Sequence, residues 1–462
     1  MTVPPLLILA VAVAAILTLI IGLRVHAFLA LIIAAILVSL LSPGDLGQRI
    51  SRVASAFGST AGEIGIVIAM AAVIGRCLID SGAADRIVRM FVHALGRERC
   101  PVALMSSGFV LSVPVFFDTV FYLLLPLARS MHRRTGRSYV MLILAMGAGA
   151  SITHSLVPPT PGPLLIADNL GINLGMMIMV ALLVAIPTAV VTLFIIGGIS
   201  RLIEIPMRPI EGRESEPEPL PDDQLPSLGL SVLPILLPVV LISSHTVVSS
   251  MAEGASTGAA AAWVSSATSI VGNANFAMLL AAGAALYILW QQRGLSLREL
   301  GEVMERSLMS GGVIILITCA GGAFGAMLKG AGVGPAVKDL LGSAMGAEVG
   351  GTGILVLAFL TAFIIKVAQG STTVAMITSS GMLAGMLASA GQIGFHHVYV
   401  ACAVGFGAQC GGWMNDSGFW IFAKMSGLTE IETLKTWTVT VSALAFVGFF
   451  FTLLFAHLLP LA

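Results

Sequence analysis

The sequence predicts an all-α polytopic membrane protein with an inverted repeat, two re-entrant helical hairpins and two broken transmembrane helices. Of its 462 residues 57% are apolar and 10% are charged, against about 25% charged in an ordinary soluble domain. Several apolar runs approach or exceed the roughly 20 residues that a spanning helix needs. Polar, Gly- and Pro-rich breaks interrupt such runs at corresponding points of the two halves. Paired interruptions of this kind point to the substrate site of a transporter.

The first 57 residues contain the runs 5–23 and 25–41 and are expected to form the N-terminal transmembrane helices. The first run lacks a basic flank and a convincing cleavage site, so we expect a retained helix rather than a signal peptide.

Two repeat units are predicted, at 58–200 and 307–428. Short matching segments occur in the same order in both units. The offset, which is the difference in residue number between matched positions, changes only slightly along the chain. These matches pair 74–90 with 324–340, 108–123 with 362–377, 145–150 with 403–408, and Gly171 with Gly427. Four ordered matches are hard to obtain by chance, even in apolar sequence.

The distribution of positive charge predicts that the two units have opposite topology. Arginines are frequent in 80–100 and in 129–137, so both segments should be cytoplasmic. The stretch 101–127 must then enter and leave on one side, as a re-entrant hairpin with its tip near Asp118. The second hairpin, 353–388, has its tip near 370–372 and cation-poor flanks, so it should enter from outside.

The remaining segments connect and close the two units. Residues 201–228 are acidic and Pro-rich, and should form a disordered cytoplasmic linker. Residues 229–306 should contain the transmembrane helices that join the units, and 429–462 the C-terminal transmembrane helix.

Four motifs carry a family resemblance. They are Val115-Phe116-Phe117-Asp118-Thr119-Val120-Phe121, Thr153-His154-Ser155-Leu156-Val157-Pro158-Pro159-Thr160-Pro161-Gly162-Pro163, Gln369-Gly370-Ser371-Thr372-Thr373-Val374-Ala375 and Asn415-Asp416-Ser417-Gly418-Phe419-Trp420. With them the chain resembles the gluconate permease family of bacterial sugar-acid and hydroxy-acid symporters. The resemblance implies a multi-pass protein of the bacterial inner membrane that imports gluconate or a related acid together with protons. No motif separates gluconate from keto-sugar acids, glycerate or D-serine. The chain is also similar to a wider group of two-hairpin transporters, which makes a homodimer plausible.

The breaks should supply the chemistry for binding an anion. A carboxylate moved into the membrane without partners is very costly, and few cations are available at mid-depth. Arg76 lies near a helix end, and Lys366 lies on the first arm of the second hairpin. Each break starts a new half-helix, whose N-terminus offers unpaired N–H groups and partial positive charge. The candidate substrate-binding residues are Asp118, Thr119, His154, Ser155, Thr160, Ser371, Thr372, Thr373, Asn415, Asp416 and Ser417.

Three of these residues are also candidates for carrying the coupled proton: Asp118, Asp416 and His154. Burial disfavours the charged form of a carboxylate, so an intramembrane aspartate can load and release a proton. The alternatives remain open, since either aspartate could simply cap a helix and His154 could be a packed side chain. Lys366 could bind the substrate carboxylate, pair with an acid or reach water.

Other functional classes fit the sequence less well. The same architecture could instead couple a carboxylate or a D-amino acid to sodium, with cation sites at the hairpin tips. An enzyme would need a nucleophile with a base or a metal-ligand set, and neither is evident. The five cysteines have no such spacing, so we expect no metal and no cofactor. Sequence alone does not exclude a channel. Zero net charge argues against nucleic acid as a partner.

Overall fold

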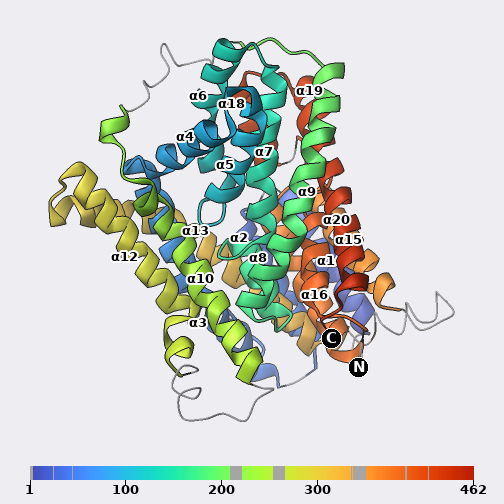
Figure 1. Ribbon diagram of the computed structural model, residues 1–462. Helices are drawn as coiled ribbons and strands as arrows, with labels where there is room; N and C mark the ends of the chain where they lie inside the picture. Colours follow the sequence, from blue (N-terminus) through green and yellow to red (C-terminus); the bar gives the residue numbers. More distant parts are fainter. Residues whose placement is uncertain are drawn as a thin grey trace.

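The computed structural model describes residues 4–23, 25–43, 45–208, 221–252, 266–333, 336, 350–390, 393–414 and 416–461. All the regular structure in these residues is helical (Figure 1). Within them, seven helices are long and apolar enough to cross a membrane. The predicted all-α membrane fold is therefore confirmed.

The first half of the chain runs from α1 to α9. Its helices are α1 (Pro5–Leu17) with a π-helical turn Thr18–Gly22, α2 (Ala27–Leu41), α3 (Ser51–Asp80), α4 (Ala83–Leu95), α5 (Cys100–Leu111), α6 (Phe117–Thr135), α7 (Tyr139–Leu156), α8 (Pro161–Asn169) and α9 (Leu174–Leu202). Part of the predicted linker, residues 209–220, lies outside the described residues.

The second half repeats the order of long helix, helix pair, interrupted helix and long helix. Its helices are α10 (Leu228–Ala252), α12 (Ala274–Arg293), α13 (Leu297–Gly330), α15 (Gly351–Gln369), α16 (Thr372–Ala390), α17 (Val398–Gly407), α18 (Ser417–Ser426), α19 (Glu430–Thr433) and, after a π-helical turn Leu434–Thr438, α20 (Val439–Leu458). Thus α5–α6 corresponds to α15–α16, and α7–α8 corresponds to α17–α18. The exact unit boundaries and the side from which each pair enters the membrane remain predictions.

The same close helix contact occurs in both halves. A Cβ atom added to Gly149 of α7 would lie 2.2 Å from the carbonyl oxygen of Met105 in α5. A Cβ atom added to Gly407 of α17 would also lie 2.2 Å from the carbonyl oxygen of Phe359 in α15. Small residues let helix backbones approach this closely in membrane proteins. The two glycines are 258 residues apart, which is the offset of the match between 145–150 and 403–408.

The interrupted helix α7–α8 runs through the centre of the bundle. Its apolar window is 83% buried, against at most 61% for the other spans of the described chain. The helices α3, α10, α12 and α13 pack along one side, and α9 and α20 pack together on the other (Figure 1). Irregular backbone is tolerated at membrane depth only where protein or a wet cavity surrounds it, so this central position allows the break.

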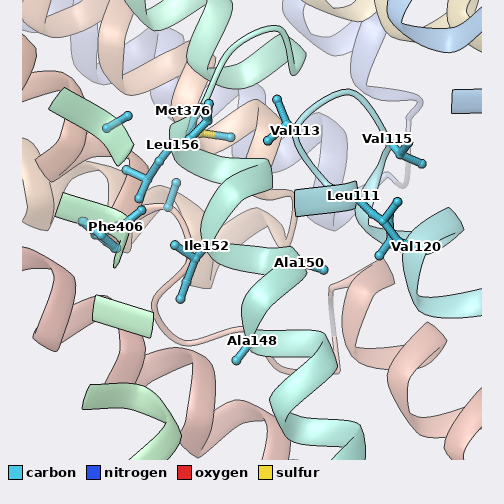
Figure 2. Close-up of a cluster of buried hydrophobic side chains, with 14 of the residues drawn as sticks. Leu111, Val113, Val115, Val120, Ala148, Ala150, Ile152, Leu156, Met376 and Phe406 are labelled. Atoms are coloured by element: carbon cyan, nitrogen blue, oxygen red, sulfur yellow. The ribbon is translucent and has the colours of Figure 1, made fainter. Parts of the chain in front are cut away.

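The cores of the two halves meet around the end of α7. Figure 2 shows Ile152 and Leu156 of α7 near Met376 of α16 and Phe406 of α17. A Cβ atom on Gly162, at the start of α8, would lie 2.1 Å from Cε of Met376. The break of the first half is thus packed directly against the second helix pair.

Candidate functional site

The first break is set by local backbone chemistry. Proline lacks an N–H group and disfavours helix at the residue before it, and α7 ends at Leu156 just before Pro158 and Pro159. The next helix begins at Pro161, where a missing N–H costs nothing.

The Thr160 hydroxyl contacts the backbone within this break, and its assignment to the substrate site stays a prediction. Its hydroxyl lies 2.8 Å from the carbonyl oxygen of His154 and 2.9 Å from that of Val157. Both oxygens belong to the end of α7, where carbonyl groups lose their helical partners. The side chain is 3% exposed and satisfies the backbone.

The second break separates α17 from α18. Asp416 is the N-cap of α18, and its Oδ1 accepts a hydrogen bond from the backbone N–H of Gly418 at 3.0 Å. The capping role considered for Asp416 is therefore present in the structure. Asn415, the neighbouring candidate, lies outside the described residues.

The turn of the first helix pair lies slightly earlier in the chain than expected. Pro114 keeps the chain non-helical, so the turn spans 112–116 and α6 begins at Phe117. Asp118 lies in the first turn of α6 but is not its N-cap, because Phe116 holds that position without a side-chain bond. In the second pair, Gly370 adopts a φ of 87° at the turn, and α16 begins at Thr372.

All four half-helix starts border one cavity of about 390 Å³. This volume falls within the roughly 300–1,000 Å³ of small-molecule pockets. The lining residues are Phe116, Phe117, Asp118, Thr119, Ser151, His154, Ser155, Pro161, Ile314, Ile317, Ser371, Thr372, Thr373, Val374, Asp416, Ser417, Gly418, Ile421 and Trp437. Except for Thr160 and Asn415, every candidate substrate-binding residue is in this set.

Lys366 forms a buried ion pair beside this cavity. Its side chain is 1% exposed, and its Nζ lies 2.8 Å from Oδ2 of Asp416. The ammonium group also donates to the carbonyl oxygen of Gly370 at 2.5 Å and to the hydroxyl of Thr372 at 3.0 Å. Of the three roles considered for Lys366, the structure shows the pairing with an acid.

Comparison with known proteins shows to which family the chain belongs. The family model described as GntP family permease matches residues 4–458. The chain belongs to the GntP family of permeases. Its multi-pass architecture is therefore that of a transporter of the bacterial inner membrane rather than an enzyme.

Two curated relatives illustrate the similarity of this permease to known proteins. The gluconate permease of Pseudomonas aeruginosa is 34% identical over 442 residues, which cover 94% of each chain. The low-affinity gluconate transporter of Escherichia coli K12 is 32% identical over 426 residues, covering 92% of each chain.

A solved structure supports the fold. The crystal structure of the YdaH transporter of Alcanivorax borkumensis superimposes with a TM-score of 0.65 at 14% identity, over 96% of this permease and 99% of that chain.

The first half contributes a different electrostatic arrangement to the permease cavity. Asp118 has no salt bridge to any described residue, and its Oδ1 accepts a hydrogen bond from the Thr119 hydroxyl at 3.4 Å. His154 packs edge-on against Phe116, with ring centroids 6.2 Å apart. Within the described chain, its buried Nδ1 has no hydrogen-bond partner. The first half therefore presents unpaired titratable groups, and the second presents a paired one.

Several residues that line the cavity were not identified from sequence. Trp437 stacks on Phe422 at 4.6 Å and on Phe117 at 5.5 Å. Nothing in its local sequence, Lys435-Thr436-Trp437-Thr438, distinguishes it from a packing residue. Ser151, by contrast, lies three and four residues before His154 and Ser155, and helical spacing alone places these three side chains on one face of α7.

Proposed function

We propose that this permease imports gluconate or a closely related sugar acid, driven by protons that move with it. The observation that carries the proposal is the convergence of the N-termini of α6, α8, α16 and α18 on one cavity. Helix N-termini bind anions through free N–H groups and the helix dipole. The relatives named as gluconate permeases or transporters supply the substrate class.

The charges around the cavity favour one orientation of the substrate. Asp416 is neutralised by Lys366, so the starts of α16 and α18 offer N–H groups and hydroxyls without an opposing net charge. The substrate carboxylate would lie there, near Thr373 and Ser417. The polyol chain would extend towards Thr119 and Ser155, whose hydroxyl groups both donate and accept.

Asp118 is the residue that we propose carries the proton. Asp118 lines the cavity and forms no salt bridge to a described residue, and a second negative charge entering the cavity adds repulsion. Protonation of Asp118 removes this repulsion, so anion and proton bind together. Asp416 is less suited, because it already has Lys366 as a counter-ion.

The sodium-coupled alternative gains no support from the second helix pair. A cation site at its tip would use backbone carbonyl and hydroxyl oxygens. The carbonyl oxygen of Gly370 and the hydroxyl of Thr372 already accept hydrogen bonds from the ammonium group of Lys366.

Uptake by the purified protein in liposomes tests this function. Labelled gluconate should accumulate when the outside is acidic, with or without sodium, and a protonophore should abolish accumulation. Glycerate, D-serine and a keto-sugar acid serve as competitors. Accumulation that requires a sodium gradient, or stronger competition by D-serine than by unlabelled gluconate, would contradict the proposal.

The variant Asp118→Asn tests the coupling residue. It should lose accumulation under a pH gradient while still exchanging external for internal gluconate, because the substrate site persists without the titrating group. Asp45→Asn is the matched control, since Asp45 lies in an exposed loop, where it accepts a hydrogen bond from the N–H of Gly47. If Asp118→Asn still concentrates gluconate, the proton is carried elsewhere.

A further inference from the structure

A second cavity, of about 860 Å³, lies apart from the substrate site. Residues of α4, the start of α5, the end of α6, the 3-10 turn 222–224 and the start of α10 form its wall. They are Asp85, Arg86, Arg89, Met90, Val92, His93, Gly96, Cys100, Leu127, Ser130, Met131, Arg134, Thr135, Asp222 and Leu228. None of them lines the substrate cavity, so this cavity needs its own explanation.

Two of the cations that line this cavity have no acidic partner within the part of the chain that the structure describes. Arg89 is already engaged, since it pairs with Asp85 at 2.7 Å and also with Asp222. Arg86 and Arg134 form no salt bridge with any described residue, although both line the cavity. Arg137, three residues beyond Arg134, pairs with Glu98 at 2.9 Å and does not line the cavity. Among the described residues, two guanidinium groups without a salt bridge therefore line one cavity.

The same space has an apolar wall. Met90 of α4, Leu127 and Met131 of α6 and Leu228 of α10 contribute it. A ligand that matches both the arginines and the apolar wall carries a negative charge and a hydrocarbon chain. A fully water-soluble anion would leave the apolar wall uncovered.

The position of α4 indicates where such a ligand comes from. This helix is strongly amphipathic: Ala83, Ala84, Ile87 and Val88 are buried, whereas Arg86, Arg89 and His93 occupy the opposite side. The buried face packs into the protein core against α5 and α10, so the side with the arginines faces away from that core. The arginines of α4 and α6 mark this end of the protein as cytoplasmic by the positive-inside rule, and the cytoplasmic leaflet carries anionic lipids.

We propose that this cavity binds the headgroup of an anionic phospholipid of the cytoplasmic leaflet. The phosphate pairs with Arg86 and Arg134, since guanidinium groups bind phosphate oxygens through paired N–H donors. An acyl chain follows Leu127, Met131 and Leu228 into the bilayer. The bound lipid connects α4 to the C-terminal turn of α6, the helix whose first turn holds Asp118.

Lipid binding to the purified, delipidated protein tests this proposal without any measurement of transport. Native mass spectrometry would compare phosphatidylglycerol with phosphatidylcholine. We expect a several-fold preference for phosphatidylglycerol, and at least a tenfold loss of its binding in the double variant Arg86→Gln/Arg134→Gln. The single variant Arg134→Gln, at an exposed position, should lose part of the binding and serves if the double variant does not fold.

Arg137→Gln is the matched control and should bind phosphatidylglycerol like the unmodified protein. Equal binding of both lipids, or undiminished binding by a folded double variant, would overturn the proposal. Displacement of the lipid by millimolar glycerol 3-phosphate would assign the cavity to a soluble phosphate compound instead. Gluconate uptake enters none of these measurements, so the outcome is separate from that of the transport proposal.

Discussion

The ammonium group of Lys366 lies 2.8 Å from the carboxylate of Asp416, and this contact joins the second helix pair to the second interrupted helix. The same ammonium group binds the carbonyl oxygen of Gly370 and the hydroxyl of Thr372. One buried cation thus fixes the first turns of α16 and α18 relative to each other. Because both turns border the substrate cavity, the ion pair sets the positions of the groups proposed to bind the anion.

Lys366→Met should severely reduce gluconate uptake. The substitution leaves the Asp416 carboxylate, which is 14% exposed, without its counter-ion. Breaking a fully buried pair costs about 3–5 kcal/mol, so a smaller loss is expected here. Thermal unfolding of the purified protein should show a clear loss of stability alongside the loss of uptake. Asp416→Asn should behave similarly, with the added loss of a charged helix cap.

The double variant Lys366→Met/Asp416→Asn provides the control. Removing both charges avoids an unpaired buried ion, so its stability should exceed that of either single variant. Additive losses in the double variant would show that the two residues act independently, contrary to the observed contact.

Gly149→Ala and Gly407→Ala should both destabilise the protein. Each added methyl group would lie 2.2 Å from a backbone carbonyl oxygen, and relieving such overpacking costs typically about 1–3 kcal/mol. Gly198→Ala in α9 is the control, because nothing lies within 4 Å of its added Cβ atom. Its melting temperature should be unchanged or slightly higher, since alanine favours helix. A loss of stability in only one of these two variants would contradict the equivalence of the two helix contacts.

Thr160→Val and Thr119→Val should separate structural from substrate-facing hydroxyl groups. Thr160 bonds two carbonyl groups at the first break, so its variant should lose about 1–3 kcal/mol of stability with little change in KM for gluconate. Thr119 lines the cavity, so its variant should raise KM and leave the melting temperature nearly unchanged. If KM rises as much for Thr160→Val as for Thr119→Val, Thr160 contacts the substrate and its role is not only structural.

Trp437→Phe should weaken gluconate binding. Trp437 borders the cavity and stacks on Phe422 at 4.6 Å and on Phe117 at 5.5 Å, so its ring supports Phe117 at the start of α6. Losing part of this stacking should raise KM about 3–10-fold, within the range of single aromatic contacts. Trp290→Phe, on the exposed side of α12, is the control. An unchanged KM for Trp437→Phe would limit the residue to packing.

The breaks in the helices were predictable because their causes are local. Four prolines between 158 and 163 exclude a continuous helix wherever the segment lies. The direction of a single side chain at such a break is not local, and for this reason Thr160 was assigned to the substrate although its hydroxyl bonds its own backbone. Asp118 was expected near a hairpin tip and lies in the first turn of α6, while Pro114 places the turn itself at 112–116.

The partner of Lys366 could not be chosen from sequence. Asp416 lies 50 residues further on in another helix, and three roles for the lysine were equally consistent with its position in the chain. Trp437 presents the same difficulty, since an aromatic residue becomes part of a cavity wall only through the packing of distant helices.

The sequence by itself determined the membrane class, the paired breaks and the polar groups available at them, because hydrophobicity and backbone restrictions act within a few residues. Only the tertiary structure decided that four half-helix starts share one cavity and that one aspartate is neutralised while the other is not. Those outcomes depend on contacts between segments far apart in the chain, where the position of one ammonium group determines which carboxylate stays unpaired.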